Sequence, residues 1–235
     1  MAKKEYLRIS EDFYSLQGEG RTMGIPAVFV RLQACNILCK GEWVCDTIDV
    51  WRKGEKSAVI KWVEYMSKYH LYLSKGAHLI FTGGEPLLQQ DSIVFAIKYF
   101  TRVYGYKPYI EIETNGTIVP SDDLIALVDL FNCSFKLENS GVKFERRIKL
   151  DALRKINKQH SIFKIVVGSR MDYLEAKKIF DVVGIEKKDI YLMPPADDIE
   201  SLNKMQLITS EICIQESVNF SSRLQVALWN KTTGV

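Results

Sequence analysis

The sequence of 235 residues has no long apolar run, no low-complexity segment and no internal repeat. A transmembrane helix needs roughly 20 consecutive apolar residues, and no stretch approaches that length. The first residues, MAKKEYLRIS, lack the apolar segment of a secretory signal. Linkers rich in glycine, proline or serine are also missing, while the hydrophobic share of 47% is sufficient for a core. We therefore expect a cytoplasmic protein that folds as a single domain over residues 1–235.

The excess of positive over negative charge is also small. The 32 Lys and Arg residues against 29 Asp and Glu residues give a net charge of +3, too small to indicate nucleic-acid binding by itself. The basic run KFERRIKLDALRKINK, residues 143–158, predicts a helix with a solvated face. We therefore expect neither nucleic acid nor a membrane among the partners.

Cysteine is sparse as well, yet three of the five cysteines fall in RLQACNILCKGEWVCDT, residues 31–47. A reducing compartment favours a metal site over a disulfide framework for Cys35, Cys39 and Cys45. A structural zinc site usually takes four ligands, and no second cysteine knuckle follows. Cys133 and Cys213 stand alone in apolar contexts and are expected in the core. Three thiolates favour a 4Fe–4S cluster with one open iron, but spacing alone leaves a partial zinc site or chance as alternatives.

Apolar stretches of strand and helix type alternate along the rest of the chain. Strands are expected in HLIFT (78–82), YIEIET (109–114), CSFKL (133–137), SIFKIVV (161–167) and IYLMP (190–194), with helical segments between them. This alternation predicts an α/β fold with a parallel sheet, closed into a partial barrel of the TIM type. A segment of roughly residues 197–235 would form a C-terminal extension.

Unusual polar residues follow these strands, where the active sites of such folds are found. A tight turn explains the glycines of TGGEP but not Glu85, and the glycines of QGEG but neither Gln17 nor Glu19. Arg31 interrupts the apolar run FVRL, which suits a bidentate carboxylate clamp or an outward-facing residue on an edge strand.

Three clustered cysteines followed by GGEP resemble the radical S-adenosylmethionine (SAM) superfamily. The finer resemblance is to the 7-carboxy-7-deazaguanine synthase (QueE) family of deazapurine biosynthesis. It is carried by FYSLQGEGRTMGIPAVFVRLQACN (13–36), WVCDT (43–47), IFTGGEPLLQ (80–89), IEIETNGT (110–117), CSFKL (133–137) and YLMPPA (191–196).

Three features depart from the family pattern. Cys39 and Cys45 are separated by five residues where the family has two, which predicts a bulged loop within KGEWV. Ser-Pro-Lys of the family is Ser134-Phe135-Lys136 here. Val226 stands in LQVALW, where the family resemblance leads us to expect a histidine.

The resemblance implies roles for particular residues. Cys35, Cys39 and Cys45 would hold the 4Fe–4S cluster, and Thr47 would bind Mg²⁺, although a Thr after Asp is often a helix N-cap. Contacts with SAM are implied for Val44, Asp46, Gly84, Glu85, Ser134, Phe135, Lys136, Met193, Pro194, Pro195 and Ala196, and Glu113 and Asn115 are further cofactor-side candidates. Contacts with the substrate are implied for Leu16, Gln17, Gly18, Arg31, Thr82 and the terminal residue Val235.

The resemblance also implies the reaction and the partners. A deoxyadenosyl radical from SAM would start ring contraction of 6-carboxy-5,6,7,8-tetrahydropterin to 7-carboxy-7-deazaguanine, with loss of ammonia. A homodimer and an external reductant such as flavodoxin are expected. Two alternatives stay open at this point: a glycyl-radical activating enzyme that acts on a partner protein, and a zinc-stabilised binding module without enzymatic activity.

Overall fold

The computed structural model describes residues 5–43, 45, 47–232 and 234. Nine strands within this part of the chain form one sheet in the order β3-β1-β2-β4-β5-β6-β7-β8-β9. The strands are β1 (Tyr6–Leu16), β2 (Pro26–Leu32), β3 (Glu55–Ala58), β4 (His78–Gly83), β5 (Ile110–Thr114), β6 (Leu130–Cys133), β7 (Ser161–Val166), β8 (Ile190–Met193) and β9 (Asn219–Phe220).

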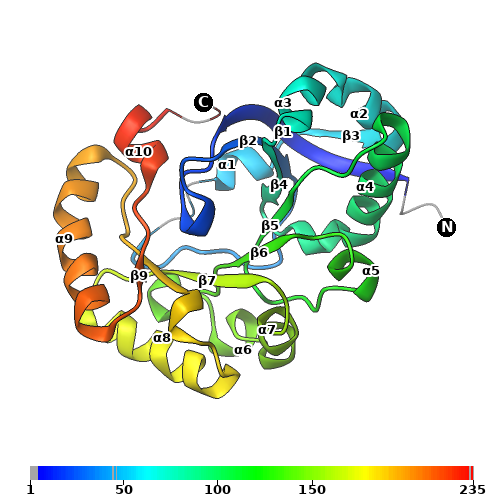
Figure 1. The fold of residues 1–235 in the computed structure, drawn as a ribbon. Coiled ribbons are helices and arrows are strands. Elements are labelled where there is room, and N and C mark those ends of the chain that lie inside the picture. The colour runs from blue at the N-terminus through cyan, green and yellow to red at the C-terminus, as the bar shows by residue number, and fades with distance from the viewer. Residues whose placement is uncertain (1–4, 44, 46, 233, 235) are drawn as a thin grey trace.

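The sheet is parallel from β2 to β9 and antiparallel only where β1 pairs with β2 and β3. The sheet curves into an open barrel with helices on its outside (Figure 1). The helices are α1 (Ile48–Trp51), α2 (Val59–Tyr65), α3 (His70–Ser74), α4 (Gln90–Tyr104), α5 (Asp122–Ile125), α6 (Phe144–Arg147), α7 (Leu150–Asn157), α8 (Arg170–Val183), α9 (Ile199–Glu216) and α10 (Leu224–Trp229).

Alternate residues of each central strand face opposite sides of the sheet. Leu79 and Phe81 of β4 belong to the large apolar core between the sheet and the helices, whereas Ile80 belongs to a separate small cluster with Phe29. The side chain that follows on the inner face of β4, Thr82, donates a hydrogen bond to Glu113 of β5. The outer face is therefore apolar. The inner face carries buried polar side chains, which are stable only where they pair with one another or bind a ligand.

The helix ends follow local capping chemistry. Ser169 accepts a hydrogen bond from the Asp172 amide at the start of α8, and Asp198 and Ser201 form a capping box at the start of α9. α4 and α8 both end at glycines in the left-handed region, Gly105 and Gly184. These signals fix where each helix begins and ends relative to the sheet.

The predicted partial barrel is confirmed, with differences in detail. The basic run forms two short helices, α6 and α7, because Ile148 between them has an extended backbone. β6 ends at Cys133, so Ser134, Phe135 and Lys136 lie in the loop beyond the strand. β1 is the longest strand at 11 residues, and it had not been expected. The segment after residue 197 is partly integral to the barrel, since β9 pairs with β8. Cys133 and Cys213 are buried in the core, as expected.

In the described part of the chain, no helix combines the length and apolar character that crossing a membrane would require.

The outer core makes a stability prediction. Phe163 on β7 is fully buried and lies near the ring of Phe135, whereas Phe144 is 52% exposed. We expect Phe163→Ala to lower the free energy of unfolding by about 3–5 kcal/mol, because it removes a buried ring and leaves a cavity. Urea unfolding measures this loss. Phe144→Ala is the control, and an equal loss in both variants would contradict the assignment of Phe163 to the core.

Candidate active site

The three clustered cysteines lie on the loop that follows β2. Cys39 is buried with Ile37 and Val142, and Cys35 and Cys45 pack against this small apolar cluster. The Cys45 amide donates to the Cys39 carbonyl at 3.2 Å, which folds the loop back on itself. The loop therefore brings all three thiols into one apolar environment.

The donor set can be tested against the expected cluster. Within the ranges that the structure describes, no three His, Cys, Asp or Glu side chains converge closely enough to hold a single metal ion. The three side chains that share the cluster of Ile37 and Val142 are nevertheless all thiols, the ligands that iron–sulfur clusters take. The side-chain amide of Asn115 lies beside them, with Nδ2 at 3.7 Å from Cys35 Sγ. The chemistry of this set fits an iron–sulfur group bound by one loop.

The glycines of GGEP allow the cluster loop to approach the end of β4. A Cβ on Gly84 would lie 2.0 Å from the Ala34 carbonyl oxygen, and a Cβ on Gly83 would lie 2.2 Å from that of Leu32. No other residue fits at either position without moving the backbone. Glu85 then donates its amide to the Ala34 carbonyl at 2.8 Å, so this turn holds the first residues of the loop.

The carboxylate of Glu85 has a structural role in addition to the expected contact with SAM. Its fully buried carboxylate accepts hydrogen bonds from the Leu87 amide (2.9 Å), the Thr114 hydroxyl (2.8 Å) and the Asn115 amide (2.7 Å). Burial raises the pKa of Glu85, and the hydrogen bonds from Asn115 and Leu87 oppose that shift. The carboxylate thus joins the ends of β4 and β5 directly beneath the cluster loop.

The loop after β6 reaches the same region. Lys136 donates to the Ser134 hydroxyl at 3.1 Å, and its ammonium lies 5.8 Å from the centre of the Trp43 ring on the cluster loop. Phe135 points the other way, into the core, where it contacts Phe180. Only the backbone of Phe135 is therefore left for a ligand on the inner side, whereas Ser134 and Lys136 offer their side chains.

The residues Met193, Pro194, Pro195 and Ala196 follow β8 at the same rim of the barrel. Met193 and Ala196 are buried, and the Met193 carbonyl accepts a hydrogen bond from the Val167 amide at 2.9 Å. Pro195 lies against Gly168, where an added Cβ would be 2.8 Å from the Pro195 ring. Both contacts join this turn to the residues that follow β7.

Two of the expected substrate residues meet on the inner face. The carboxylate of Glu113 accepts from Gln17 Nε2 at 3.2 Å and from Thr82 Oγ1 at 2.7 Å. Lys164 Nζ of β7 lies 3.5 Å from the same carboxylate. Gln17 is only 2% exposed, although it belongs to a loop. Glu113 thus lies with the substrate candidates rather than beside Asn115 and the cluster loop.

Glu19 is another acid of the inner face with several partners. It accepts from Lys164 at 2.6 Å, from Gln225 at 2.7 Å and from Arg223 at 3.2 Å. Burial alone would raise the pKa of Glu19, but the charges of Lys164 and Arg223 outweigh it and lower this pKa to about 2. Desolvation alone would lower the pKa of the buried Lys164, but the negative charges of Glu19 and Glu113 raise it. Both groups therefore stay charged inside the barrel at neutral pH.

Arg31 faces the inner side of the barrel and is already paired. Its Nε lies 2.8 Å from Glu11 Oε1 of β1, and its guanidinium lies 5.8 Å from the centre of the Phe13 ring. The C-terminal end approaches this pair, since a Cβ on Gly234 would lie 3.6 Å from Glu11 Oε2. Arg31 is thus not an outward-facing residue of an edge strand.

The remaining expected residues divide into two groups. Leu16 ends β1, Gly18 is packed so tightly that a Cβ would lie 2.0 Å from Gln225 Oε1, and Thr47 precedes α1 without a capping side-chain bond. Thr47 Oγ1 instead lies 3.5 Å from Cys45 Sγ. The expected roles of Val44, Asp46 and Val235 fall on positions outside the described residues.

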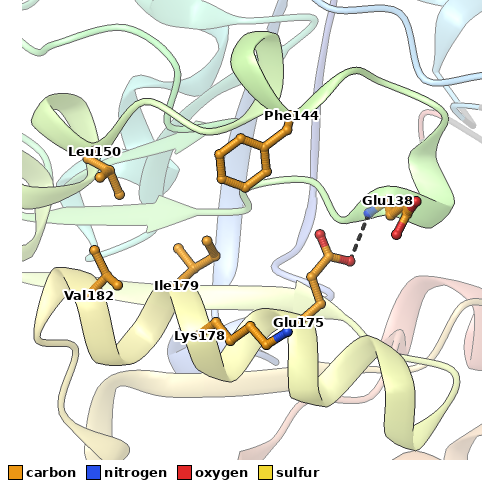
Figure 2. Close-up of a pocket in the computed structure, with 7 residues that line it drawn as sticks. All are labelled: Glu138, Phe144, Leu150, Glu175, Lys178, Ile179 and Val182. Carbon is orange, nitrogen blue, oxygen red and sulfur yellow. Dashed lines mark hydrogen bonds between the residues drawn. The ribbon is translucent and has the colours of Figure 1, made fainter.

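A separate cavity of about 380 Å³ lies on the outer side of the barrel, between the α6–α7 region and α8 (Figure 2). Its wall includes Glu175, which accepts from the Glu138 amide at 2.9 Å and pairs with Arg147 at 2.7 Å. Arg147 also donates to the Lys136 carbonyl at 2.9 Å. This wall therefore supports the loop that carries Lys136, although the cavity itself faces away from the inner face.

Comparisons with known proteins agree with this geometry. The sequence is 32% identical over 234 residues to a 7-carboxy-7-deazaguanine synthase from Pyrobaculum aerophilum, with all of both chains covered. It is 30% identical to the synthase of the same description from Halobacterium salinarum, over 95% of this chain and 91% of that one. The chain belongs to the 7-carboxy-7-deazaguanine synthase family. No family model matches the sequence.

The fold has a solved counterpart. The crystal structure of QueE from Escherichia coli superposes with a TM-score of 0.67 over 93% of this chain and 94% of the other, at 22% identity. Membership of the family confirms the resemblance inferred from the motifs, and it does not favour the glycyl-radical activating or zinc-module alternatives.

Sequence reasoning missed the charged partners of the inner face. Lys164 was read only as part of an apolar strand, and Arg223 and Gln225 were not noticed. The signal for Lys164 was a lone lysine inside the apolar strand SIFKIVV, because an unpaired charge is costly to bury. No comparable signal marked Arg223, because its partner Glu19 is 204 residues away in the sequence.

The depressed pKa of Glu19 predicts an acid-dependent stability. A folded-state pKa of about 2 against an ordinary value of 4.5 means that the carboxylate stabilises the fold above pH 4.5 and loses this effect as pH falls toward 2. The full contribution is about 3 kcal/mol. We expect urea unfolding between pH 6 and pH 3 to show a shallower loss in Glu19→Gln than in the wild type. Glu145→Gln, at an exposed position, is the control, and parallel curves for all three proteins would contradict the prediction.

Proposed function

We propose that this chain catalyses the radical SAM ring contraction of 6-carboxy-5,6,7,8-tetrahydropterin to 7-carboxy-7-deazaguanine, with release of ammonia, as a single-domain cytoplasmic enzyme. Its membership of the synthase family supports the reaction. The observation that carries the site is the meeting of Gln17, Thr82 and Glu113 inside the barrel, on the rim that also carries the cysteine loop. An amide, a hydroxyl and a carboxylate at this point suit the alternating donors and acceptors of a pterin edge.

The iron–sulfur cluster would be held by Cys35, Cys39 and Cys45. When bound, it would supply the electron that cleaves SAM and starts the radical reaction. Contacts with SAM are proposed for Gly84, Glu85, Ser134, Lys136, for the backbone of Phe135 and for the turn Met193–Ala196. Val44 and Asp46, which flank Cys45 in the sequence, are included on family likeness alone.

The chain's own residues would bind and orient the substrate. Leu16, Gln17 and Gly18 would read the pterin edge together with Thr82. Arg31 would lie near the carboxylate-bearing end of the substrate, and the Val235 carboxylate would help to close the site. Arg31 would need to share its guanidinium between Glu11 and the substrate, because Nε is already bonded to Glu11. The buried, paired carboxylates around the site hold these groups in place and keep bulk water away from a reactive intermediate.

Three further parts of the proposal rest on family likeness. Mg²⁺ would bind at Thr47, whose hydroxyl is a hard oxygen ligand. An external reductant such as flavodoxin would supply electrons. A homodimer is also proposed, and α9 offers a surface for it. Leu207 and Ile214 on its outer side are 64% and 79% exposed, and the charges of Lys204 and Glu211 could pair across a two-fold axis.

The first test joins cofactor and substrate. The protein would be purified without oxygen, reconstituted with iron and sulfide, reduced with an external reductant, and then given SAM and the carboxytetrahydropterin. We expect about four irons per chain, a brown absorption band and formation of 7-carboxy-7-deazaguanine. Cys39→Ala should lose the band and the product, whereas Cys213→Ala, a buried cysteine in α9, should keep both. A cluster without product would overturn the proposed substrate, and zinc without iron uptake would overturn the radical chemistry.

A second test concerns the cation. If Thr47 binds Mg²⁺, Thr47→Val should raise the Mg²⁺ concentration for half-maximal activity by about tenfold or more, because a ligand oxygen is replaced by a methyl group of similar size. Thr47→Ser keeps the hydroxyl and should behave like the wild type. Identical Mg²⁺ titrations for the valine and serine variants would show that the Thr47 hydroxyl does not bind the cation.

A further inference from the structure

Glu19 of the QGEG motif has no place in the proposed chemistry, yet it organises one end of the site. The segment 221–225, which leads into α10, lies along the turn that contains it. The Gly20 amide donates to Ser221 Oγ at 2.8 Å, the Leu224 amide donates to the Gly18 carbonyl at 2.9 Å, and Gln225 reaches Glu19 at 2.7 Å. The turn after β1 is thus held by a segment more than 200 residues away in the chain.

Arg223 connects this turn to a second one. Its Nε lies 3.2 Å from Glu19 Oε1, and its Nη1 donates to the backbone carbonyl of Ala196. Ala196 belongs to the turn after β8. One planar guanidinium, with its side chain 14% exposed, therefore spans the turn proposed to read the pterin and the turn proposed to contact SAM.

Apolar packing supports the same junction. Ala196, Leu202 of α9 and Val226 of α10 form a small buried cluster beside the Arg223 contact. Val226 stands where a histidine was expected, and the structure uses it to fill this cluster. Gln225 also packs closely on the turn after β1, since a Cβ on Gly18 would lie 2.0 Å from Gln225 Oε1.

We propose that Arg223 and Glu19 are positioning residues that couple the two turns, so that a ligand on either turn favours the arrangement that binds the other. This inference rests on the proposed function, which places the pterin at residues 16–18 and SAM at residues 193–196. Thermodynamic coupling is reciprocal, so each ligand must tighten the binding of the other by the same factor. If Arg223 bridges the two turns through Glu19 and Ala196, this factor depends on Arg223.

The test uses the reconstituted holoenzyme with the cluster oxidised and no reductant, so that binding occurs without turnover. Calorimetric titration gives the affinity for SAM with and without the carboxytetrahydropterin, and the reverse. In the wild type we expect each ligand to tighten the other by about fivefold or more. Arg223→Lys keeps the charge but cannot reach both partners with one planar group. It should bring the factor close to one while each ligand alone binds within about threefold of the wild type.

Arg21→Lys is the matched control. Arg21 lies on the same turn but pairs with Asp189 at 2.6 Å, away from Ala196. It should keep the wild-type coupling factor. A factor that is unchanged in Arg223→Lys, that falls equally in Arg21→Lys, or that equals one in the wild type would overturn the inference. A general loss of folding would instead weaken both single affinities, which the titrations report separately.

A second measurement needs no ligand and separates this inference from the proposed function. Amide hydrogen exchange would be followed in the segments 16–25 and 193–198 of the holoenzyme. Arg223→Lys should speed exchange in both segments, and Arg21→Lys, whose partners Asp189 and Tyr191 precede the second segment, should leave 193–198 unchanged. If the wild type fails to bind the pterin, the proposed substrate is wrong, and the exchange result alone decides the bridge. Faster exchange in only one segment would show that the turns are not joined through Arg223.

Discussion

The site depends on one constraint, the common direction of the strands from β2 to β8. Because these strands are parallel, their carboxyl ends meet at a single rim, and every loop that leaves this rim faces the same space. The cysteine loop, the GGEP turn, the residues after β5 and β6 and the turn after β8 all leave from it. Segments spread over 160 residues therefore become neighbours without any long connection crossing the barrel.

The inner face adds a cost that the fold must offset. A carboxylate such as Glu85, Glu113 or Glu19 loses hydration when it is enclosed by the sheet, and each is held by hydrogen bonds or cations in return. Glu85 is held mainly by hydrogen bonds, and burial raises its pKa, whereas the cations around Glu19 lower its pKa to about 2. The two acids thus respond oppositely to enclosure because their partners differ in charge. The network around Glu19 joins the turn after β1 to β7 and to the C-terminal segment.

The sequence allowed the five strands from β4 to β8, the cluster loop and the rim turns to be predicted, since each is encoded locally by periodicity or by glycine and cysteine spacing. Residues such as Gln17 and Thr82 could be assigned to one side of the site only through family likeness. The pairings of Lys164 with Glu19 and of Arg223 with Ala196 could not be predicted, because they join β7, the first turn and the C-terminal segment across the barrel. β1 was missed because its polar residues interrupt the apolar alternation of a strand that lies near the edge of the sheet.

Two departures from the family pattern prove to be neighbours in space. The widened cysteine loop packs on the turn after Lys136: a Cβ on Gly41 would lie 2.2 Å from the Asn139 carbonyl, and Trp43 Nε1 donates to Asn139 Oδ1 at 3.1 Å. The Trp43 ring also lies near the Lys136 ammonium. Replacement of proline by Phe135 buries a ring in the core behind this contact. The extra loop residues are thus anchored on the same segment in which the proline was lost, and the two changes are best understood as one altered contact between the cluster loop and the loop after β6.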